Sequence, residues 1–316
     1  MEPRVSIIIP HYNIPDLLLN LLESIPPNNE IQVIVVDDKS TKQIEQYEGL
    51  VSRFSRSNVE FYRNEGKNSA GRCRNVGLDH AKGEWIMFAD ADDFFNKGWY
   101  EIVKRLLDTD YDMIRFCSSS YNLDENRPDP RHEIVDDFVM TYLDNPTPDN
   151  MKWLCYHVNA VWSALYRRSF LDAHNIRFEP VMYGNDVAFS TLCAYHVKKF
   201  GCFRDEIYCV TRRSNSLTTT FSAEADQIRK EVAIRRLGFL YRNLTPEEIH
   251  NLGLGSGDFA PIKLLNEVRK NPKTREKLPM YRRMMRNEKV PAVNWKYILM
   301  HPIEELREII KKLAHK

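Results

Sequence analysis

Short apolar runs alternate with stretches of helical spacing along the first 120 residues. Continuous or nearly continuous apolar residues predict buried strands at 5–9, 31–36, 59–62, 85–89 and 113–117. Apolar residues at every third or fourth position predict helices at 16–24, 41–54, 69–81 and 99–107. Because strands that alternate with helices indicate βαβ units, we expect an α/β fold with a Rossmann-like, mainly parallel sheet flanked by helices.

The pattern is less regular in the rest of the chain. Residues 119–150 are polar and rich in Asp, Asn and Pro, which is typical of a disordered excursion or of a functional loop beside a site. Beyond them we expect a helix at 186–196 and a strand at 207–211, followed by a helical and charged region. We therefore predict a sheet-containing domain over residues 1–225 and a helical extension over residues 226–316.

Charge changes this picture only near the C-terminal end. The 316 residues carry a net charge of +1, which gives no indication of a nucleic-acid partner. Residues 263–316, however, hold 15 Lys and Arg against 6 Asp and Glu, a net charge of +9. Apolar residues recur at helical spacing over 303–313. Such a basic amphipathic tail can lie on an anionic membrane surface, or pack on its own domain or on another subunit.

Cysteine usage and hydropathy bear on location. The six cysteines are scattered and form no Cys-x-x-Cys pair, and the N-terminal residues have no signal-peptide pattern. No apolar run approaches the roughly 20 residues that a membrane span needs. We therefore expect reduced thiols and a cytoplasmic location, with peripheral contact at the inner face of the cell membrane as a further possibility.

The most informative chemistry comes after the predicted strand at 85–89. Asp90, Asp92 and Asp93 come directly after it, where an open α/β sheet collects its ligands. Carboxylate oxygens suit Mg²⁺ and Mn²⁺, which bridge readily to diphosphate oxygens. The cluster thus indicates a site for a metal and a nucleotide, although Asp is also common in turns after strands.

Two other strand ends and one helix add candidates. The first strand runs into Pro10 and Tyr12, and the aromatic ring of Tyr12 can stack on a nucleobase or simply pack. Asp38 follows the second strand and can accept from a base N–H or cap the next helix. On the helix at 69–81, Arg72 and Arg74 point to different sides, so at least one of them is expected to be an ordinary surface charge.

Four ordered blocks carry a more specific signal, namely Val5 to Asn13, Val35-Val36-Asp37-Asp38-x-Ser40, Gly71-x-x-Arg74-Asn75-x-Gly77 and Ala81-x-Gly83-Glu84-Trp85-Ile86-x-Phe88-x-Asp90-x-Asp92-Asp93. Together they resemble the family 2 glycosyltransferases, which have the GT-A fold. The resemblance covers about the first hundred residues and continues more loosely to about Phe221. Residues 226–316 lie outside the shared core.

The resemblance implies an inverting transferase that moves a sugar from a nucleotide-diphosphate sugar, most often a UDP-sugar, to a hydroxyl of a glycan or lipid-linked acceptor. By analogy with the family this would serve bacterial surface-polysaccharide assembly, such as capsule or lipopolysaccharide. Residues 1–225 would form the nucleotide-sugar-binding and catalytic domain. By matching positions, Tyr12 and Asp38 would contact the base, Asp90 would contact the ribose, and Asp92 would bind the Mn²⁺ or Mg²⁺ ion. Pro10 and Arg74 would line the donor pocket, and Asp93 would orient nearby groups.

The candidate catalytic base is Asp186, because an acceptor hydroxyl is a poor nucleophile and needs a carboxylate to take its proton. Family members usually have Glu-Asp where this chain has Asn185 and Asp186, so the acidic neighbour of the base is replaced by an amide. Alternatively, Asp186 only favours the first turn of a helix. Arg212 or Arg213 would either neutralise charge on the phosphates of the donor or lie in a solvated loop. Trp162 would either shape the acceptor pocket or belong to the hydrophobic core.

Two other classes of function remain to be distinguished. A nucleotidyltransferase usually has a Gly-rich phosphate loop with Lys or Arg near its first strand, and residues 10–13 are not of that kind. A GT-A protein that binds nucleotide sugars without turnover is the other alternative. Asn185 keeps it open, whereas the presence of Asp90, Asp92 and Asp186 argues for an enzyme.

Overall fold

The computed structural model describes residues 2–54, 58–214, 222–254, 261–271 and 274–291. The chain divides into two compact units, residues 1–220 and residues 221–316, and each is considered by itself. The helix predicted over 303–313 lies outside the described residues.

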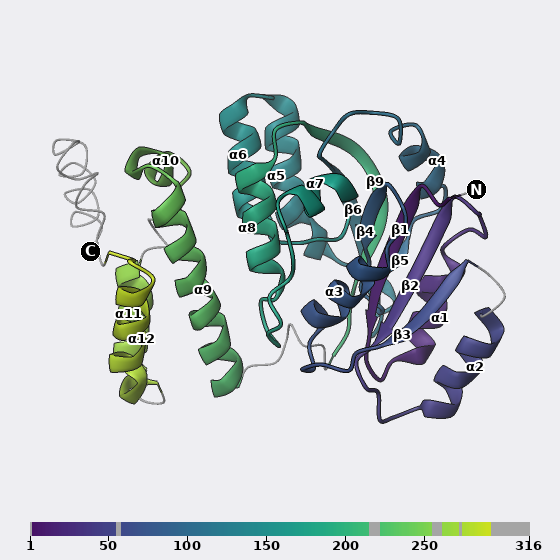
Figure 1. Ribbon diagram of the computed structural model, residues 1–316, viewed down its shortest axis with the longest axis horizontal. Coiled ribbons are helices and arrows are strands. Elements are labelled where there is room, and N and C mark those ends of the chain that lie inside the picture. Colours follow the sequence, from purple (N-terminus) through teal and green to yellow (C-terminus); the bar gives the residue numbers. More distant parts are fainter. Residues whose placement is uncertain (1, 55–57, 215–221, 255–260, 272–273, 292–316) are drawn as a thin grey trace. The chain divides into compact units, whose positions relative to one another are not determined.

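One nine-stranded sheet runs through the described part of the first unit (Figure 1). Its strands are β1 (Val5–His11), β2 (Ile31–Asp37), β3 (Val59–Arg63), β4 (Trp85–Phe88), β5 (Phe94–Phe95), β6 (Met113–Asn122), β7 (Arg127–Pro128), β8 (Ala164–Arg167) and β9 (Phe200–Arg212). The order is β3-β2-β1-β4-β8-β6-β9-β5, with β7 paired to β6. The first four strands of this order are parallel, while β8 is antiparallel to both of its neighbours.

The position of β1 explains where ligands are expected. The chain moves outward from β1 through β2 to β3, and then returns to place β4 on the other side of β1. This reversal is a topological switch point, and open α/β sheets typically bind ligands at such a point, at the carboxyl ends of the strands. The acidic cluster predicted from the sequence follows β4, so it lies at this switch point.

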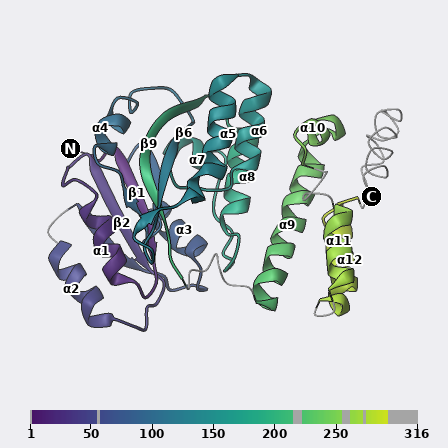
Figure 2. The same cartoon turned by 180° about the vertical axis from the view of Figure 1, so that it is seen from behind.

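Helices cover both faces of the sheet (Figures 1 and 2). They are α1 (Pro15–Glu23), α2 (Ile44–Phe54), α3 (Ala70–His80), α4 (Trp99–Lys104), α5 (Glu133–Asp144), α6 (Pro148–His157), α7 (Arg168–Ala173) and α8 (Asp186–His196), with a short 3-10 helix at Pro130–His132.

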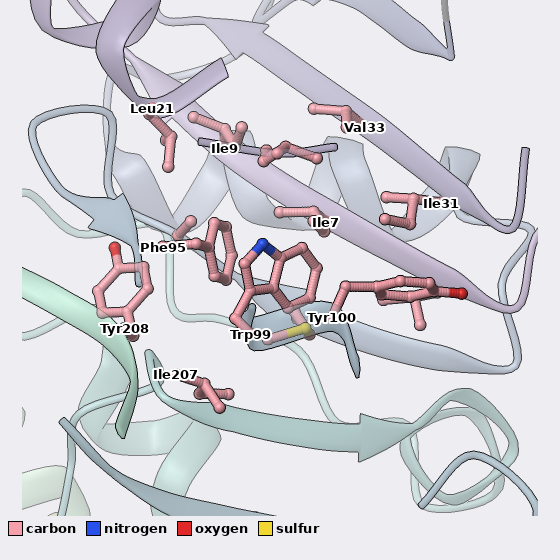
Figure 3. Close-up of a cluster of buried hydrophobic side chains, with 14 of the residues drawn as sticks. Ile7, Ile9, Leu21, Ile31, Val33, Phe95, Trp99, Tyr100, Ile207 and Tyr208 are labelled. Atoms are coloured by element: carbon pink, nitrogen blue, oxygen red, sulfur yellow. The ribbon is translucent and has the colours of Figure 1, made fainter. Parts of the chain in front are cut away.

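Side chains of β1 alternate between two cores, because successive residues of a strand point to opposite faces. Ile7 and Ile9 belong to the cluster that includes Trp99 of α4 and side chains of α1 (Figure 3). Ile8 faces the other way, onto α3. A Cβ atom at Gly77 of α3 would lie 2.3 Å from the Ile8 Cγ2 atom, so only glycine lets α3 approach the sheet this closely.

The prediction of a disordered or loop segment over residues 119–150 was wrong. In the structure β6 continues to Asn122, and α5 and the start of α6 occupy most of the segment beyond this strand. Thr147 caps α6 by accepting a hydrogen bond from the Asn150 N–H, and Pro148 takes the first helical position, where its missing N–H costs nothing. The abundance of Asp, Asn and Pro in this segment therefore reflects helix ends and not disorder.

The second unit is helical, as predicted. Its described elements are α9 (Ala223–Asn243), α10 (Pro246–Asn251), α11 (Pro261–Lys270), a 3-10 helix (Arg275–Lys277) and α12 (Leu278–Asn287). A small core joins α9, α11 and α12 through Ile234, Leu237, Val268, Tyr281, Met285 and Val290. No helix in the described part of the chain has both the length and the apolar character that crossing a membrane requires.

Candidate active site

Three parts of the chain meet at the side chain of Arg74 on α3. Its Nη2 donates to the Asp90 Oδ1 at 2.5 Å, and its Nη1 donates to the Asn185 Oδ1 at 2.7 Å. The guanidinium carbon lies 5.2 Å from the centre of the Phe178 ring. Only 7% of the Arg74 side chain is exposed, whereas Arg72 on the same helix is exposed. Arg74 is therefore the buried member of the predicted arginine pair, and it joins the acidic cluster to the start of α8.

Local interactions fix α3 where this bridge forms. Ser69 caps the helix by accepting from the Arg72 N–H. The Asn75 amide donates to the Phe178 carbonyl at 2.9 Å and accepts from the Phe178 N–H at 2.8 Å, which ties α3 to the chain before α8. A Cβ atom at Gly71 would lie 2.5 Å from the Glu179 carbonyl oxygen, so a larger residue would push this segment away.

Asp186 is the first residue of α8, directly after the Arg74 partner Asn185. Burial raises the pKa of the Asp186 carboxyl, the positive charge of Arg74 opposes that rise, and the negative charge of Asp90 adds to it. A carboxylate with a raised pKa is a stronger proton acceptor than an exposed one. The environment of Asp186 thus suits a general base.

Asp92 is held beside the end of β9. Its Oδ2 accepts from the Arg213 Nε at 3.3 Å, and its backbone carbonyl accepts from the Thr211 hydroxyl at 2.6 Å. Burial raises the pKa of the Asp92 carboxyl, the negative charge of Asp90 adds to the rise, and Arg213 opposes it. A largely buried carboxylate with an acidic neighbour favours a nearby cation.

Asp93 and Tyr208 form the support beneath this cluster. The Asp93 Oδ1 accepts from the Thr211 N–H at 2.7 Å, and its Oδ2 accepts from the Tyr208 hydroxyl at 2.9 Å. The same hydroxyl accepts from the Asp90 N–H at 2.8 Å, so Tyr208 holds both ends of the acidic turn. Complete burial and the charges of Asp92 and Asp90 raise the pKa of the Asp93 carboxyl well above its usual range.

The ring of Trp162 stacks with that of Tyr208. The two rings are nearly parallel, with an interplanar angle of 12° and centroids 6.1 Å apart. Trp162 is only partly buried. It is therefore connected to the acidic turn through Tyr208 and retains some exposed surface, which is compatible with either of the roles expected for it.

The loops after β1, β2 and β3 form a second group of side chains. Tyr12 is 50% exposed, as a ring free to stack on a ligand must be. Asp38 is buried, its N–H donates to the His11 carbonyl at 2.8 Å, and its Oδ1 accepts from the Asn64 amide at 2.6 Å. Asn64, which is fully buried, also donates to the Lys67 carbonyl, so the neighbour that orients Asp38 is itself held by a hydrogen bond.

The two arginines at the end of β9 take different partners. Arg213 pairs with Asp92, whereas Arg212 is 58% exposed and its Nη1 lies 3.4 Å from the Oδ2 of the buried Asp129. Pro10, the last of the predicted donor-side residues, lies within β1 and is half-buried.

Sequence reasoning missed Asn64, Asn75 and Tyr208. Asn64 follows β3 directly, and its position at a strand end is a signal that could have identified it. Asn75 lies inside one of the conspicuous blocks but was given no role of its own. Tyr208 lies inside a strand and has no local signature, because its hydroxyl reaches the acidic turn only after the sheet has formed.

The sequence model of glycosyl transferase family 2 matches residues 6–174, more than half of the chain. This chain belongs to glycosyl transferase family 2. Among curated relatives, it is 26% identical to the glycosyltransferase GlyG of Streptococcus pneumoniae serotype 4 over 70% of this chain and 74% of that protein. It is also 36% identical over 100 residues to TarS of Staphylococcus aureus, a poly(ribitol-phosphate) β-N-acetylglucosaminyltransferase. This match covers 30% of this chain and 17% of TarS.

Solved structures confirm the GT-A fold of this family member. The S. aureus TarS fragment 1–349 in complex with UDP-GlcNAc matches with a TM-score of 0.59 and 18% identity, over 90% of this chain and 89% of that chain. The mannosyltransferase PcManGT of Pyrobaculum calidifontis, in complex with GDP-Man and Mn²⁺, matches with a TM-score of 0.53 and 14% identity, over 92% and 87%. Of the first curated relatives, the match spans half of one protein, EpsH of Bacillus subtilis, and about a sixth of TarS.

The residues present fit a divalent cation that is completed by its substrate. In the described ranges no three His, Cys, Asp or Glu side chains gather as a ready-made metal cage. Mg²⁺ and its close analogues usually keep several waters and bind through one or two carboxylates plus substrate phosphates. Asp92, largely buried and beside Asp90, is a carboxylate of this kind.

Proposed function

We propose that this family 2 protein is an inverting glycosyltransferase that moves a sugar from a UDP-sugar to a hydroxyl of a glycan or lipid-linked acceptor. The observation that carries the proposal is the bridge through Arg74, which joins Asp90 at the end of β4 to the residue before Asp186. The side chain of Arg74 thus connects the proposed donor-side acid to the start of α8, where the proposed proton acceptor lies. Relatives named as glycosyltransferases, one of them solved with UDP-GlcNAc, support the reaction class and the donor class.

On the donor side, the exposed ring of Tyr12 would stack on the base and Asp38 would accept from a base N–H. Asp90 would accept from the ribose hydroxyls, and Asp92 would hold Mn²⁺ or Mg²⁺. When bound, such an ion supplies Lewis-acid stabilisation of the negative charge on the departing diphosphate. Arg213 lies next to Asp92 and would move its positive charge onto the phosphates once a cation takes its place.

On the acceptor side, Asp186 would take the proton of the incoming hydroxyl as its oxygen attacks the anomeric carbon. Inversion needs one such base, on the sugar face opposite the leaving group, whereas retention by double displacement needs a protein nucleophile as well. Trp162 would shape the acceptor pocket beside this base. In this proposal one carboxylate, Asp92, binds the metal ion, and another, Asp186, accepts the proton.

The test measures UDP release by the purified protein with Mn²⁺, a panel of UDP-sugars and candidate glycan acceptors. Thermal protection by each sugar nucleotide is measured in parallel, because a ligand that binds only the native state raises the melting temperature. We expect Mn²⁺-dependent protection by at least one UDP-sugar and acceptor-dependent UDP release. Protection without release would favour a nucleotide-sugar-binding protein, and formation of UTP and sugar 1-phosphate from a UDP-sugar and added pyrophosphate would favour a nucleotidyltransferase.

We further propose that the helical extension contacts an anionic membrane surface, which would bring the site to a lipid-linked acceptor. The exposed side chains of α12 include Arg282, Arg283 and Arg286, which supports this role. Cosedimentation with phosphatidylglycerol vesicles should be strong at low salt and weak at high salt, and should fall when these three arginines are replaced by glutamine. Equal sedimentation with neutral phosphatidylcholine vesicles would contradict the proposal.

A further inference from the structure

We infer that Arg74 is a positioning residue: by holding Asp90 and Asn185 at the same time, it sets the start of α8, and with it Asp186, relative to the donor. This role goes beyond lining the nucleotide pocket and rests on the proposed function of the same site. It predicts that part of the contribution of Arg74 to catalysis passes through Asn185, a residue on the acceptor side.

The geometry of the bridge requires an arginine. The guanidinium group is planar and presents its N–H donors in a fixed fork, so one side chain can bind two acceptors in a defined direction. Here Nη1 and Nη2 reach acceptors from parts of the chain that lie 111 and 16 positions from Arg74. A lysine at this place would keep the charge but lose the fork.

Asn185 supports the inference independently. Asparagine is among the residues best suited to cap a helix, since its side-chain oxygen can accept from a free N–H of the first turn. In α8 this cap bond is absent, although Asn185 directly precedes the helix. Its Oδ1 instead accepts from the Arg74 Nη1 at 2.7 Å. The side chain is therefore used to tie the helix start to α3.

The surroundings make this tie effective. The Asn75 amide binds both backbone groups of Phe178, and Gly71 allows contact with Glu179 and Asn185, so α3 and the chain before α8 are in close contact. The charges of Arg74 and Asp90 both act on the Asp186 carboxyl, and backbone N–H groups at the start of α8 also favour its ionised form. Of the two charges, only that of Arg74 favours the carboxylate.

Asn185 is also neutral, which matters for the charge of the bridge. A carboxylate at this position would compete with Asp90 for the guanidinium group and add a negative charge beside Asp186. With an amide in place, Arg74 makes its one strong ion pair with Asp90 at 2.5 Å. The positive charge of Arg74 therefore also acts on the nearby Asp186 carboxyl and favours its ionised form.

The experiment is a double-mutant cycle on the full chain, with UDP release and donor KM measured for the wild type, Asn185→Leu, Arg74→Lys and the double variant. Leucine has the same branched shape and the same number of side-chain heavy atoms as asparagine but accepts no hydrogen bond. We expect Asn185→Leu to lower kcat about tenfold while donor KM stays within about twofold. Arg74→Lys should lower kcat at least as much and also raise donor KM. The double variant should have a kcat close to that of Arg74→Lys alone, because both changes break the same bond.

A pH profile separates position from charge. Arg74→Gln removes the positive charge that opposes protonation of Asp186, so the acidic limb of the kcat profile should move to higher pH. Arg74→Lys keeps the charge and should move this limb less, although its kcat is still low. Arg72→Gln, on the exposed side of the same helix, is the matched control and should leave kcat and its pH profile unchanged. Melting temperatures identify any variant that fails to fold.

Independent, multiplying losses of kcat in the double variant would overturn the inference, as would an Arg74→Lys variant in which only donor KM changes. Either result would leave Arg74 as a donor-binding residue. Failure of the wild type to release UDP with any donor and acceptor has a different meaning, because it contradicts the proposed function and the inference together.

Discussion

The two sides of the site are built in different ways. On the donor side, Tyr12, Asp38 and Asn64 lie in the loops after β1, β2 and β3, and each loop is short and bonded to its neighbour. On the acceptor side, Asn185 and Phe178 bind residues that lie more than 100 positions away in the sequence. The positions of the donor-side residues are thus set by successive βα units. The positions of the acceptor-side residues are set by a few hydrogen bonds between segments far apart in the sequence.

This difference indicates where the site is vulnerable. Parallel strands that are neighbours in the sheet place their loops together by the geometry of the sheet itself. A segment held by one or two side-chain bonds depends on those bonds for its position, and a misplacement of about 1 Å can cost about 100-fold in rate. We therefore expect acceptor-side changes to affect kcat and donor-side changes to affect donor affinity.

The largest effect is expected for Asp186→Asn. The amide cannot take the acceptor proton, so kcat should fall by about a hundredfold or more. Thermal protection by the sugar nucleotide and Mn²⁺ should persist, because the donor side is intact. Asp79→Asn, an exposed position on α3, serves as the control. UDP release at the wild-type rate by Asp186→Asn would remove this residue from its assigned role.

Asp92→Ala is expected to abolish Mn²⁺-dependent protection, since the carboxylate proposed to hold the ion is gone. Because the pKa of Asp92 is raised, protection of the wild type should weaken as the pH falls through that pKa and the carboxylate takes up a proton. Differential scanning fluorimetry with and without Mn²⁺ over a pH series measures both effects. A variant that retains full metal-dependent protection would show that the ion binds elsewhere.

Asn64→Leu tests the donor side by itself. It removes a hydrogen bond to the buried carboxylate of Asp38, and such bonds contribute about 1.5–3 kcal/mol. We expect donor KM to rise about tenfold, while kcat at saturating donor changes little. Steady-state kinetics at varied UDP-sugar distinguishes the two parameters. A loss confined to kcat would break the proposed division between the two sides of the site.

The smallest effect is expected for Tyr208→Phe, which keeps the ring against Trp162 but removes the hydroxyl. The Asp93 carboxylate and the Asp90 N–H each lose a buried partner. A loss of about 2 kcal/mol is expected from an unsatisfied buried group, or about 4–8 °C in melting temperature for a unit of this size. An unchanged melting temperature would mean that the acidic turn holds its shape without Tyr208.

Much of the fold could be predicted because its signals are local. The strand starting at Val5 and the helix starting at Ala70 are recognisable from runs and spacings of apolar residues. Residues 119–150 were misjudged because their polar composition obscured α5, which packs against β6 and β9, and the start of α6. Predicted strands at 113–117 and 207–211 are longer in the structure, since β6 and β9 extend each other by pairing.

The amino-acid sequence by itself determined the order of the βα units and the placement of acids at strand ends, because both follow from local periodicity. Only the tertiary structure decided that Arg74 and not Arg72 is buried, and that Arg213 and not Arg212 pairs with Asp92. Neighbouring residues of the same type are equivalent in a sequence. They become different when packing gives one a buried partner and leaves the other in water.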